Sequence, residues 1–334
     1  MMRYVRPSVP TVLRLKISLL GTHAGRNGHH QARTASAKLS AVRIGVREQS
    51  SSASDHDHDG IEDAAEAGGS AALKAFRDIV VSRTAAQSFG DKDVDGGVLR
   101  DIMALTQSAP SSFNVQPWSV VLVRDRADRE RLSSAMLGHN ARKVASAPVT
   151  AVFCADLEPS KRIRRMVELN RQAGMPEAEI SKLSLAVNLF SGEGLVGNVV
   201  RQAVTSLASP MQPAPEVSSV EAWSFKNTGL AAQTYILACT AHGLATSPME
   251  GFDARRVRAA LDIPDRYGIP IVVSTGYPTP STATEGGDRG RGTPSGTKRW
   301  RYPPEEVVFD GAFGVGMTGI DPVVGPNTGT KDSS

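Results

Sequence analysis

The densest group of side chains able to orient a ligand lies in the stretch APSSFNVQP, residues 109–117, just ahead of the apolar run WSVVLV. Ser111 and Ser112 supply hydroxyl groups, and Asn114 supplies an amide that both donates and accepts hydrogen bonds. The prolines on either side limit the freedom of the backbone. The stretch is therefore either an ordinary helix-to-strand connection or a stiffened set of polar groups that faces a ligand.

Three further polar clusters have the same two interpretations. Arg83 ends a predicted helix, and the segment HNARK places Asn140 and Lys143 three residues apart. Arg299 and Arg301 are separated by one residue, which in an extended chain puts both guanidinium groups on one side, as phosphate binding requires. A solvated surface or a turn explains each cluster taken alone. Together they fit a large anionic ligand that carries amide groups.

Reactive side chains are scarce in the part of the chain predicted to fold. Its two histidines are His139 and His242, and His242 falls in an apolar helix, where a core histidine is the commoner role. The sequence has no G-x-S-x-G turn, no G-x-x-x-x-G-K-[ST] phosphate loop, no G-x-G-x-x-G after a strand and no H-E-x-x-H. Cys154 and Cys239 lie in apolar stretches and predict buried thiols. If the protein is an enzyme, a bound cofactor is expected to carry the reaction.

Charge divides the chain into a basic head and a mildly acidic body. Residues 1–47 hold nine Lys or Arg and no acidic residue, whereas the other 287 residues hold 29 basic and 34 acidic ones. With its Ser, Thr and Ala, the head has the composition of a transit peptide, most simply a mitochondrial one; a disordered tail without an address is the alternative. Residues 48–70 predict a disordered polar linker, in which DHDHDG is better explained by linker composition than by a metal site. We expect residues 1 to about 70 to be dispensable for ligand binding and dimerisation.

Hydrophobic periodicity predicts an α+β body with helices on both faces of a mixed sheet. The run 148–155 is apolar on both faces and so predicts a central strand. The segment 224–243 is apolar nearly all round and predicts a buried helix that Gly243 ends. A Pro-rich loop is predicted for 208–222. The other predicted strands are 118–123 and 269–278, and the other predicted helices are 71–83, 95–109, 127–137, two within 158–190 separated by Gly174 and Pro176, and 253–263 capped by Asp253.

Four blocks of the sequence, taken together, resemble the FMN-dependent nitroreductase family. APSSFNVQPW is similar to its signature loop, and NARKVASAPVTAVFCA to its Asn-x-x-Lys segment and the strand that follows. GLATSPMEGFDARRV resembles the segment around Pro-x-Glu-Gly-Phe, and RWRYP resembles the C-terminal basic clamp. The blocks occur in the family's order. The resemblance implies a three-layer domain over residues 71–310, a dimer with an extended C-terminal arm, and a Gly-rich flexible tail over 311–334.

The resemblance also implies a cofactor site at the interface between two subunits. Arg83, Arg299 and Arg301 would bind the FMN phosphate, and the signature loop would reach the flavin from the partner subunit. Asn140 and Lys143 would contact the pyrimidine edge of the flavin. The complete set of implied cofactor-binding residues is Arg83, Ala85, Gln87, Pro110, Ser111, Ser112, Asn114, Asn140, Lys143, Pro248, Met249, Glu250, Gly251, Arg299 and Arg301. No metal is implied, and the flavin N5 rather than a side chain would carry the chemistry.

One segment departs from the family pattern of basic-basic-Ser-x-basic ahead of a Phe. Arg83 and Phe89 match, but Ala85 stands where a hydroxyl is usual and Gln87 where a second cation is usual. Lys143 is then the main positive charge expected near the pyrimidine edge. A lower flavin potential or an altered range of substrates is the expected consequence.

The predicted function is therefore NAD(P)H-linked reduction of nitroaromatics, quinones or related electron-poor compounds by ping-pong hydride transfer on FMN. One alternative is a specialised reductase of the same fold, such as an enone reductase or a dehalogenase. Another is a flavin-binding protein without turnover, which the neutral Gln87 motivates. Trp223 and Phe225 have two interpretations, a stacking surface for substrate or aromatic residues of the core.

Overall fold

The structure of the chain is a computed structural model, which describes residues 58–194, 199, 202–203, 205–207, 209–211, 213, 218–279 and 301–321, with the backbone alone for 58–68. The predictions for the basic head, for DHDHDG up to residue 57, for Arg299 and for the tail after 321 fall outside the described residues.

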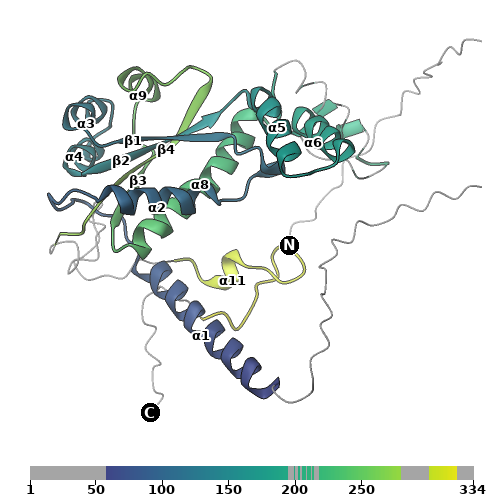
Figure 1. The fold of residues 1–334 in the computed structure, drawn as a ribbon, viewed down its shortest axis with the longest axis horizontal. Coiled ribbons are helices and arrows are strands. Elements are labelled where there is room, and N and C mark those ends of the chain that lie inside the picture. Colours follow the sequence, from purple (N-terminus) through teal and green to yellow (C-terminus); the bar gives the residue numbers. More distant parts are fainter. Residues whose placement is uncertain are drawn as a thin grey trace, which may run out of the picture. The chain divides into compact units, whose positions relative to one another are not determined.

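A sheet of four strands forms the centre of the fold (Figure 1). The strands are β1 (Trp118–Val123), β2 (Val149–Asp156), β3 (Ala245–Met249) and β4 (Tyr267–Gly276), in the order β1-β2-β4-β3. All three pairings between strands are antiparallel. The sequence predicted a mixed sheet, with both parallel and antiparallel pairing. Among the described residues, the parallel pairing is the isolated bridge between Ala85 and Thr246, at the outer edge of β3.

Strand β2 is central, as its apolar sequence predicts, and each of its residues is buried. Ala155, near its C-terminal end, pairs with Trp118 of β1. Val149, at its N-terminal end, pairs with Thr275 of β4, and Thr275 pairs in turn with Thr246 of β3. The start of β1 and the start of β3 therefore lie at diagonally opposite corners of the sheet.

Helices cover both faces of the sheet, as Figure 1 shows. On one face Ile102 and Tyr235 pack against Phe153 of β2, all three being fully buried. On the other face Leu132 and Val144 pack against Val152. Burying each such side chain contributes about 1.5–3 kcal/mol. The helices on the first face are α2 (Gly96–Gln107) and α8 (Val220–Ala241), and those on the second are α3 (Arg126–Ser133), α4 (His139–Ser146) and α9 (Ala254–Ala260).

The residues that the sequence predicts to cap or end helices α9 and α8 do so in the structure. Asp253 accepts from the backbone N–H groups of Arg255 and Arg256 and so caps α9. Gly243, at φ +71°, follows α8 and allows the left-handed turn that ends it. The predicted helix at 127–137 ends earlier, at Ser133, and α8 begins at Val220, inside the predicted loop 208–222, because Ser219 caps it.

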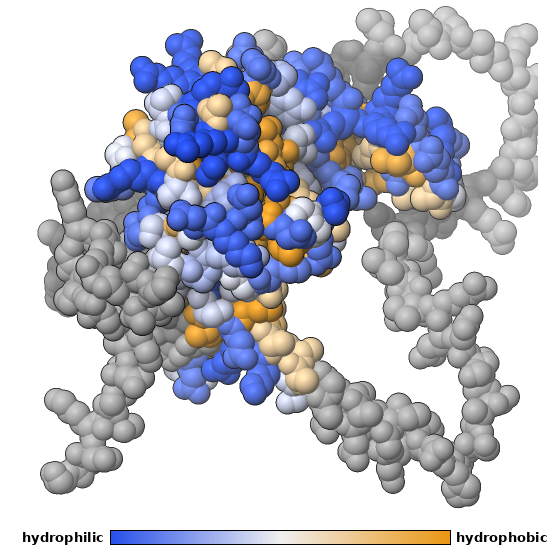
Figure 2. Space-filling view, turned by 60° about the vertical axis from the view of Figure 1, so that its left-hand side comes forward, coloured by the Kyte–Doolittle hydropathy of each residue, from blue (hydrophilic) through white to orange (hydrophobic). Residues whose placement is uncertain are grey.

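The remaining helices are α1 (His58–Ser82), α5 (Ile163–Gln172), α6 (Glu177–Phe190) and α11 (Pro304–Val307), with the short 3-10 turns η1 (Ser112–Asn114) and η2 (Pro159–Arg162). The predicted break between α5 and α6 is confirmed, with Gly174 at φ +80°. Helix α1 begins at His58, so it takes in part of the predicted linker. Two large apolar side chains of this helix are exposed within the described chain, Leu73 at 67% and Phe76 at 55%. Apolar patches are visible among the hydrophilic side chains in Figure 2.

Candidate functional site

The loop before β1 has an unusual backbone. Phe113, Asn114 and Gln116 have φ angles of 55°, 54° and 50°, in the left-handed region. Asn tolerates this region, but for residues such as Phe it costs about 1–3 kcal/mol. The loop also binds itself, because Ser111 Oγ accepts from the Gln116 N–H across 2.9 Å and the Ser111 carbonyl accepts from the Asn114 N–H across 3.0 Å. The loop is thus ordered by its own hydrogen bonds, and Ser111 serves partly as a structural residue.

The loop is also attached to helices α6 and α8. The rings of Phe113 and Phe190 stack with their centroids 5.7 Å apart. Val115 is buried against Met166 and Trp223. The Ser112 N–H donates to Oδ1 of Asn227 on α8 across 2.7 Å. Ser111 and Ser112 are half-buried, whereas Pro110 and Asn114 are exposed.

A second group of predicted residues lies along β3. The segment after α1 is bound to this strand by the bridge between Ala85 and Thr246 and by a hydrogen bond from the Ala86 N–H to the Thr246 carbonyl, 2.9 Å long. Arg83 and Gln87, on either side of Ala85, are half-buried. Ala85, where the family pattern has a hydroxyl, is therefore part of the edge pairing of the sheet.

The other end of β3 meets α4. Asn140 Nδ2 donates to the Gly251 carbonyl across 3.1 Å, and the Leu137 N–H donates to the same oxygen across 3.0 Å. A Cβ at Gly251 would lie 2.8 Å from Asn140 Nδ2, so a side chain at this position would displace the Asn140 amide. Lys143 lies three residues after Asn140, on the same side of the helix, and is half-buried.

The side chains of residues 248–251 differ in their exposure. Met249 is 3% exposed, with its side chain in the core, whereas Glu250 is exposed. Pro248 and Gly251 are half-buried. Together the groups at β3 comprise Arg83, Ala85, Gln87, Asn140, Lys143 and residues 248–251.

The structure thus divides the predicted residues into two groups. Residues 110–114 precede β1 at one corner of the sheet, and the β3 group begins at the diagonally opposite corner, where Ala85 pairs with Thr246. Within one chain, the signature loop and the segment around Ala85 therefore lie at opposite edges of the sheet. Arg301 is exposed at the start of the segment 301–321.

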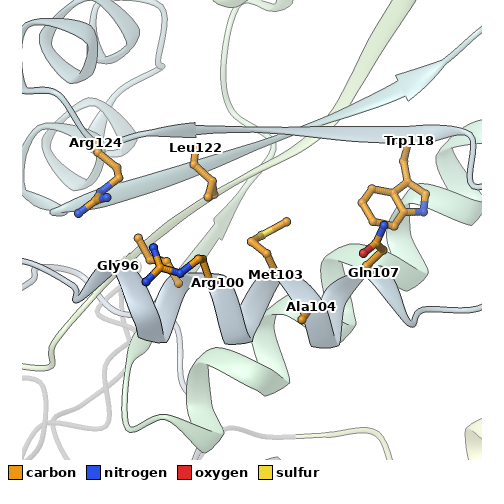
Figure 3. A pocket seen from close by; sticks show the side chains of 9 residues that line it. Gly96, Arg100, Met103, Ala104, Gln107, Trp118, Leu122 and Arg124 are labelled. Atoms are coloured by element: carbon orange, nitrogen blue, oxygen red, sulfur yellow. The ribbon is translucent and has the colours of Figure 1, made fainter.

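A cavity of about 540 Å³ lies between α2 and β1. Figure 3 shows Trp118 and Leu122 of β1 on one side of it and Arg100 and Met103 of α2 on the other, with Arg124 at one end. Trp118 Nε1 is buried and has no hydrogen-bond partner among the described residues. The lining contains none of the described residues of the predicted cofactor site.

Four residues that the sequence left open are now placed. Trp223 is 4% exposed and belongs to the core, and Phe225 packs close to Gly268 of β4. His242 is not a core residue, because it ends α8 with its side chain 29% exposed and pairs with Asp101 Oδ2 at 2.7 Å. His139 is exposed at the start of α4.

Both cysteines are buried thiols, as predicted. Burial raises the pKa of Cys154 to about 12. Burial likewise raises the pKa of Cys239 to about 12. Because the thiolate is the reactive form, neither side chain suits nucleophilic catalysis near neutral pH.

Comparison with known proteins identifies the class of protein. Residues 80–277 match the model of the nitroreductase family. A Thermus thermophilus protein named NADH dehydrogenase is 30% identical over 199 residues, which are 59% of this chain and 84% of that protein. A nitroreductase family protein from Streptococcus pneumoniae has a similar fold, with a TM-score of 0.52 at 24% identity over 70% of this chain and 99% of that one.

The chain belongs to the nitroreductase family, because the match spans more than half of it. Membership places the protein among the oxidoreductases and agrees with the α+β fold of the described residues. The matched range includes the loop, Arg83 and the β3 group, and it ends before Arg299 and Arg301. Within the described part of the chain, no helix is both long enough and apolar enough to cross a membrane.

The predicted site residues did not include Asn227, whose Oδ1 accepts a hydrogen bond from the Ser112 N–H of the loop. The available signal was the position of its amide in a helix predicted to be buried, because a buried polar group must find hydrogen-bond partners.

Proposed function

We propose that the chain is an FMN-dependent oxidoreductase that takes hydride from NAD(P)H and delivers it to nitroaromatics, quinones or related electron-poor acceptors in a ping-pong cycle. Family membership and the NADH dehydrogenase relative support the reaction class and the reductant. The observation that carries the proposal is the meeting of three distant segments along β3: residues 83–87, α4 with Asn140 and Lys143, and residues 248–251.

The groups at β3 suit a flavin mononucleotide in their chemistry. Arg83 and Lys143 are cations, and Gln87 and Asn140 are amides, which match a phosphate and an amide-bearing ring edge. Because Gly251 has no Cβ, its backbone can lie close to a neighbouring group such as a ligand. The donor set therefore fits an anionic ligand with a polar edge.

FMN, when bound, supplies the N5 position that accepts and donates hydride. The protein's part is to bind and orient it. Lys143 favours negative charge at the pyrimidine edge. Arg83, with Arg299 and Arg301, holds the phosphate. No side chain is required as an acid or a base.

The signature loop contributes to the site from a second copy of the chain. The diagonal separation of the loop from the β3 group supports this arrangement, because a complete site then needs two subunits. Exposed apolar side chains on α1 and in the segment 301–321 also support it, Phe313 being 94% exposed. We therefore propose a homodimer with sites at the interface.

A specialised reductase, such as an enone reductase or a dehalogenase, is the second candidate. The feature that favours it is the segment at Ala85 and Gln87, where an alanine stands in place of a hydroxyl residue and an amide in place of a cation. Such an enzyme would oxidise NAD(P)H only with its own acceptor class.

Steady-state kinetics of the full chain test the proposal. With excess FMN, we expect NADH or NADPH oxidation that requires a nitroaromatic or a quinone. Double-reciprocal plots at several acceptor concentrations should be parallel, as a ping-pong cycle requires. Turnover with an enone or a halogenated aromatic alone would select the second candidate. Absence of FMN-dependent oxidation with every acceptor class would refute both.

A further inference from the structure

Asn227 is a buried amide whose two ends both have partners. It lies on α8 and is 1% exposed. Its Oδ1 accepts from the Ser112 N–H at 2.7 Å, and its Nδ2 donates to the Trp223 carbonyl at 2.8 Å. Because one partner is a donor and the other an acceptor, the orientation of the amide is fixed.

The hydrogen bond to Asn227 is distinctive among the contacts of the loop. Within the described residues, it is the one hydrogen bond that joins residues 110–116 to a distant element. The remaining hydrogen bonds of Ser111 and Gln116 are made within the loop or to neighbouring residues. Strained backbone of this kind persists only when its surroundings hold it in place.

We propose that Asn227 is a positioning residue, whose carboxamide fixes the Ser112 N–H and so sets the arrangement of Ser111, Ser112 and Asn114 that binds FMN. This inference rests on the proposed function. Asn227 acts through the loop and touches no ligand. The bond to Asn227 adds to the loop's own hydrogen bonds and apolar contacts in holding the three left-handed residues, and it is the one that fixes the Ser112 N–H.

Asn227→Ser separates the two hydrogen bonds of the side chain. Serine and threonine in helices donate to the carbonyl four residues back. Thr228 and Thr234 of the same helix do so at 2.8 Å and 2.9 Å. The serine hydroxyl can therefore keep the bond to the Trp223 carbonyl, but it is too short to reach Ser112. Asn227→Thr is a second variant with the same logic.

Asn170→Ser is the matched control. Asn170 Nδ2 also donates to the carbonyl four residues back, that of Met166, at 2.8 Å. Asn170 has no hydrogen bond to the loop among the described residues. The same substitution at this position therefore changes a helix bond without removing a hydrogen bond of the loop.

Two measurements on the full chain test the inference. The first is amide hydrogen exchange of the peptide spanning residues 110–117, without added flavin. We expect exchange to be roughly 2- to 12-fold faster in Asn227→Ser than in the wild type, since one hydrogen bond is lost. The second is the Kd for FMN, followed by flavin fluorescence, which we expect to rise in the same range. In Asn170→Ser, both quantities should stay within about twofold of the wild type.

The outcomes separate the inference from the proposed function. Unchanged exchange in both Asn227 variants would show that Asn227 does not hold the loop. Faster exchange with an unchanged FMN Kd would show that the loop's arrangement does not matter for binding, and the inference would fail while the proposed function stood. A wild-type chain that binds no FMN would overturn the proposed function and the inference with it, although the exchange result would still decide whether Asn227 orders the loop.

Discussion

Asn140 and Gly251 are 111 positions apart in sequence, and Asn140 Nδ2 donates to the Gly251 carbonyl at 3.1 Å. A Cβ at Gly251 would lie 2.8 Å from the same nitrogen. This pair joins α4, which carries Lys143, to the end of β3. The position of the cation relative to the backbone at 248–251 therefore depends on a contact that a side chain at position 251 would disturb.

A double-mutant cycle tests this contact. Gly251→Ala should lower the free energy of unfolding by about 0.5–1.5 kcal/mol, because the added Cβ displaces the Asn140 amide from the Gly251 carbonyl. Asn140→Ala should lower it by about 0.5–1.5 kcal/mol through the lost hydrogen bond. The double variant should lose less than the sum, because removing the amide relieves the clash. Urea unfolding supplies all three values, and strict additivity would show that the two residues do not interact.

Lys143→Ala and Arg301→Ala are expected to fail in different ways if the proposed function holds. Arg301→Ala should weaken FMN retention, because charge-assisted hydrogen bonds to a phosphate contribute about 1.5–3 kcal/mol each. It should recover much of its activity with excess FMN. Lys143→Ala should retain more FMN than Arg301→Ala does. NAD(P)H should reduce its bound FMN more slowly, because the cation at the pyrimidine edge is gone.

Stopped-flow reduction by NAD(P)H, with both variants saturated with FMN, compares them directly. Slower reduction in Arg301→Ala than in Lys143→Ala would show that the two roles are assigned wrongly.

The two cysteines should be unreactive in the native protein. Cys154 and Cys239 are both buried, and burial raises the pKa of each to about 12. Iodoacetamide at about pH 8 should therefore leave both thiols unmodified, because the thiolate form is nearly absent. In urea, mass spectrometry should detect two modified cysteines per chain. Rapid native labelling of either residue would contradict the buried placement.

Asp95, the N-cap of α2, should make stability depend on pH in the acid range. Hydrogen bonds from the backbone N–H groups of Val98 and Gly97 lower the pKa of Asp95 below its ordinary value of 3.8. A depressed pKa in the folded state adds stability above the unfolded pKa, and this contribution is lost as the pH falls through the folded value. Asp95→Asn keeps an acceptor at the cap but does not titrate. The advantage of the wild type in unfolding free energy should therefore shrink from about pH 7 to about pH 3, and a constant difference would count against this account.

The sequence predicts the long elements of the fold well. The runs at 118–123 and 148–155 are rich in Val and other apolar residues, and β1 and β2 match them within one residue. Strand β3 was not predicted as a strand, because it has five residues and contains Pro248. Proline is tolerated there since β3 is an edge strand.

The sequence could propose residues for the candidate site, but it could not give their geometry. Family resemblance selected Ala85 and Gly251, but their placement near opposite ends of β3 depends on strand pairing that no local pattern specifies. The role of His242 was predicted wrongly, because it lies at the C-terminal end of α8 and reaches Asp101 at the surface. Asn227 was missed because its partner, Ser112, is 115 positions away.

The central claim, that the β3 group binds FMN for hydride transfer, is tested most directly by the visible spectrum of the purified full chain. We predict a yellow protein that releases FMN, and not FAD, when it is denatured. Its flavin absorption should bleach on addition of NADH or NADPH without oxygen and return when a quinone is added. A colourless protein that takes up no FMN, or one whose bound flavin neither nicotinamide reduces, would contradict the account.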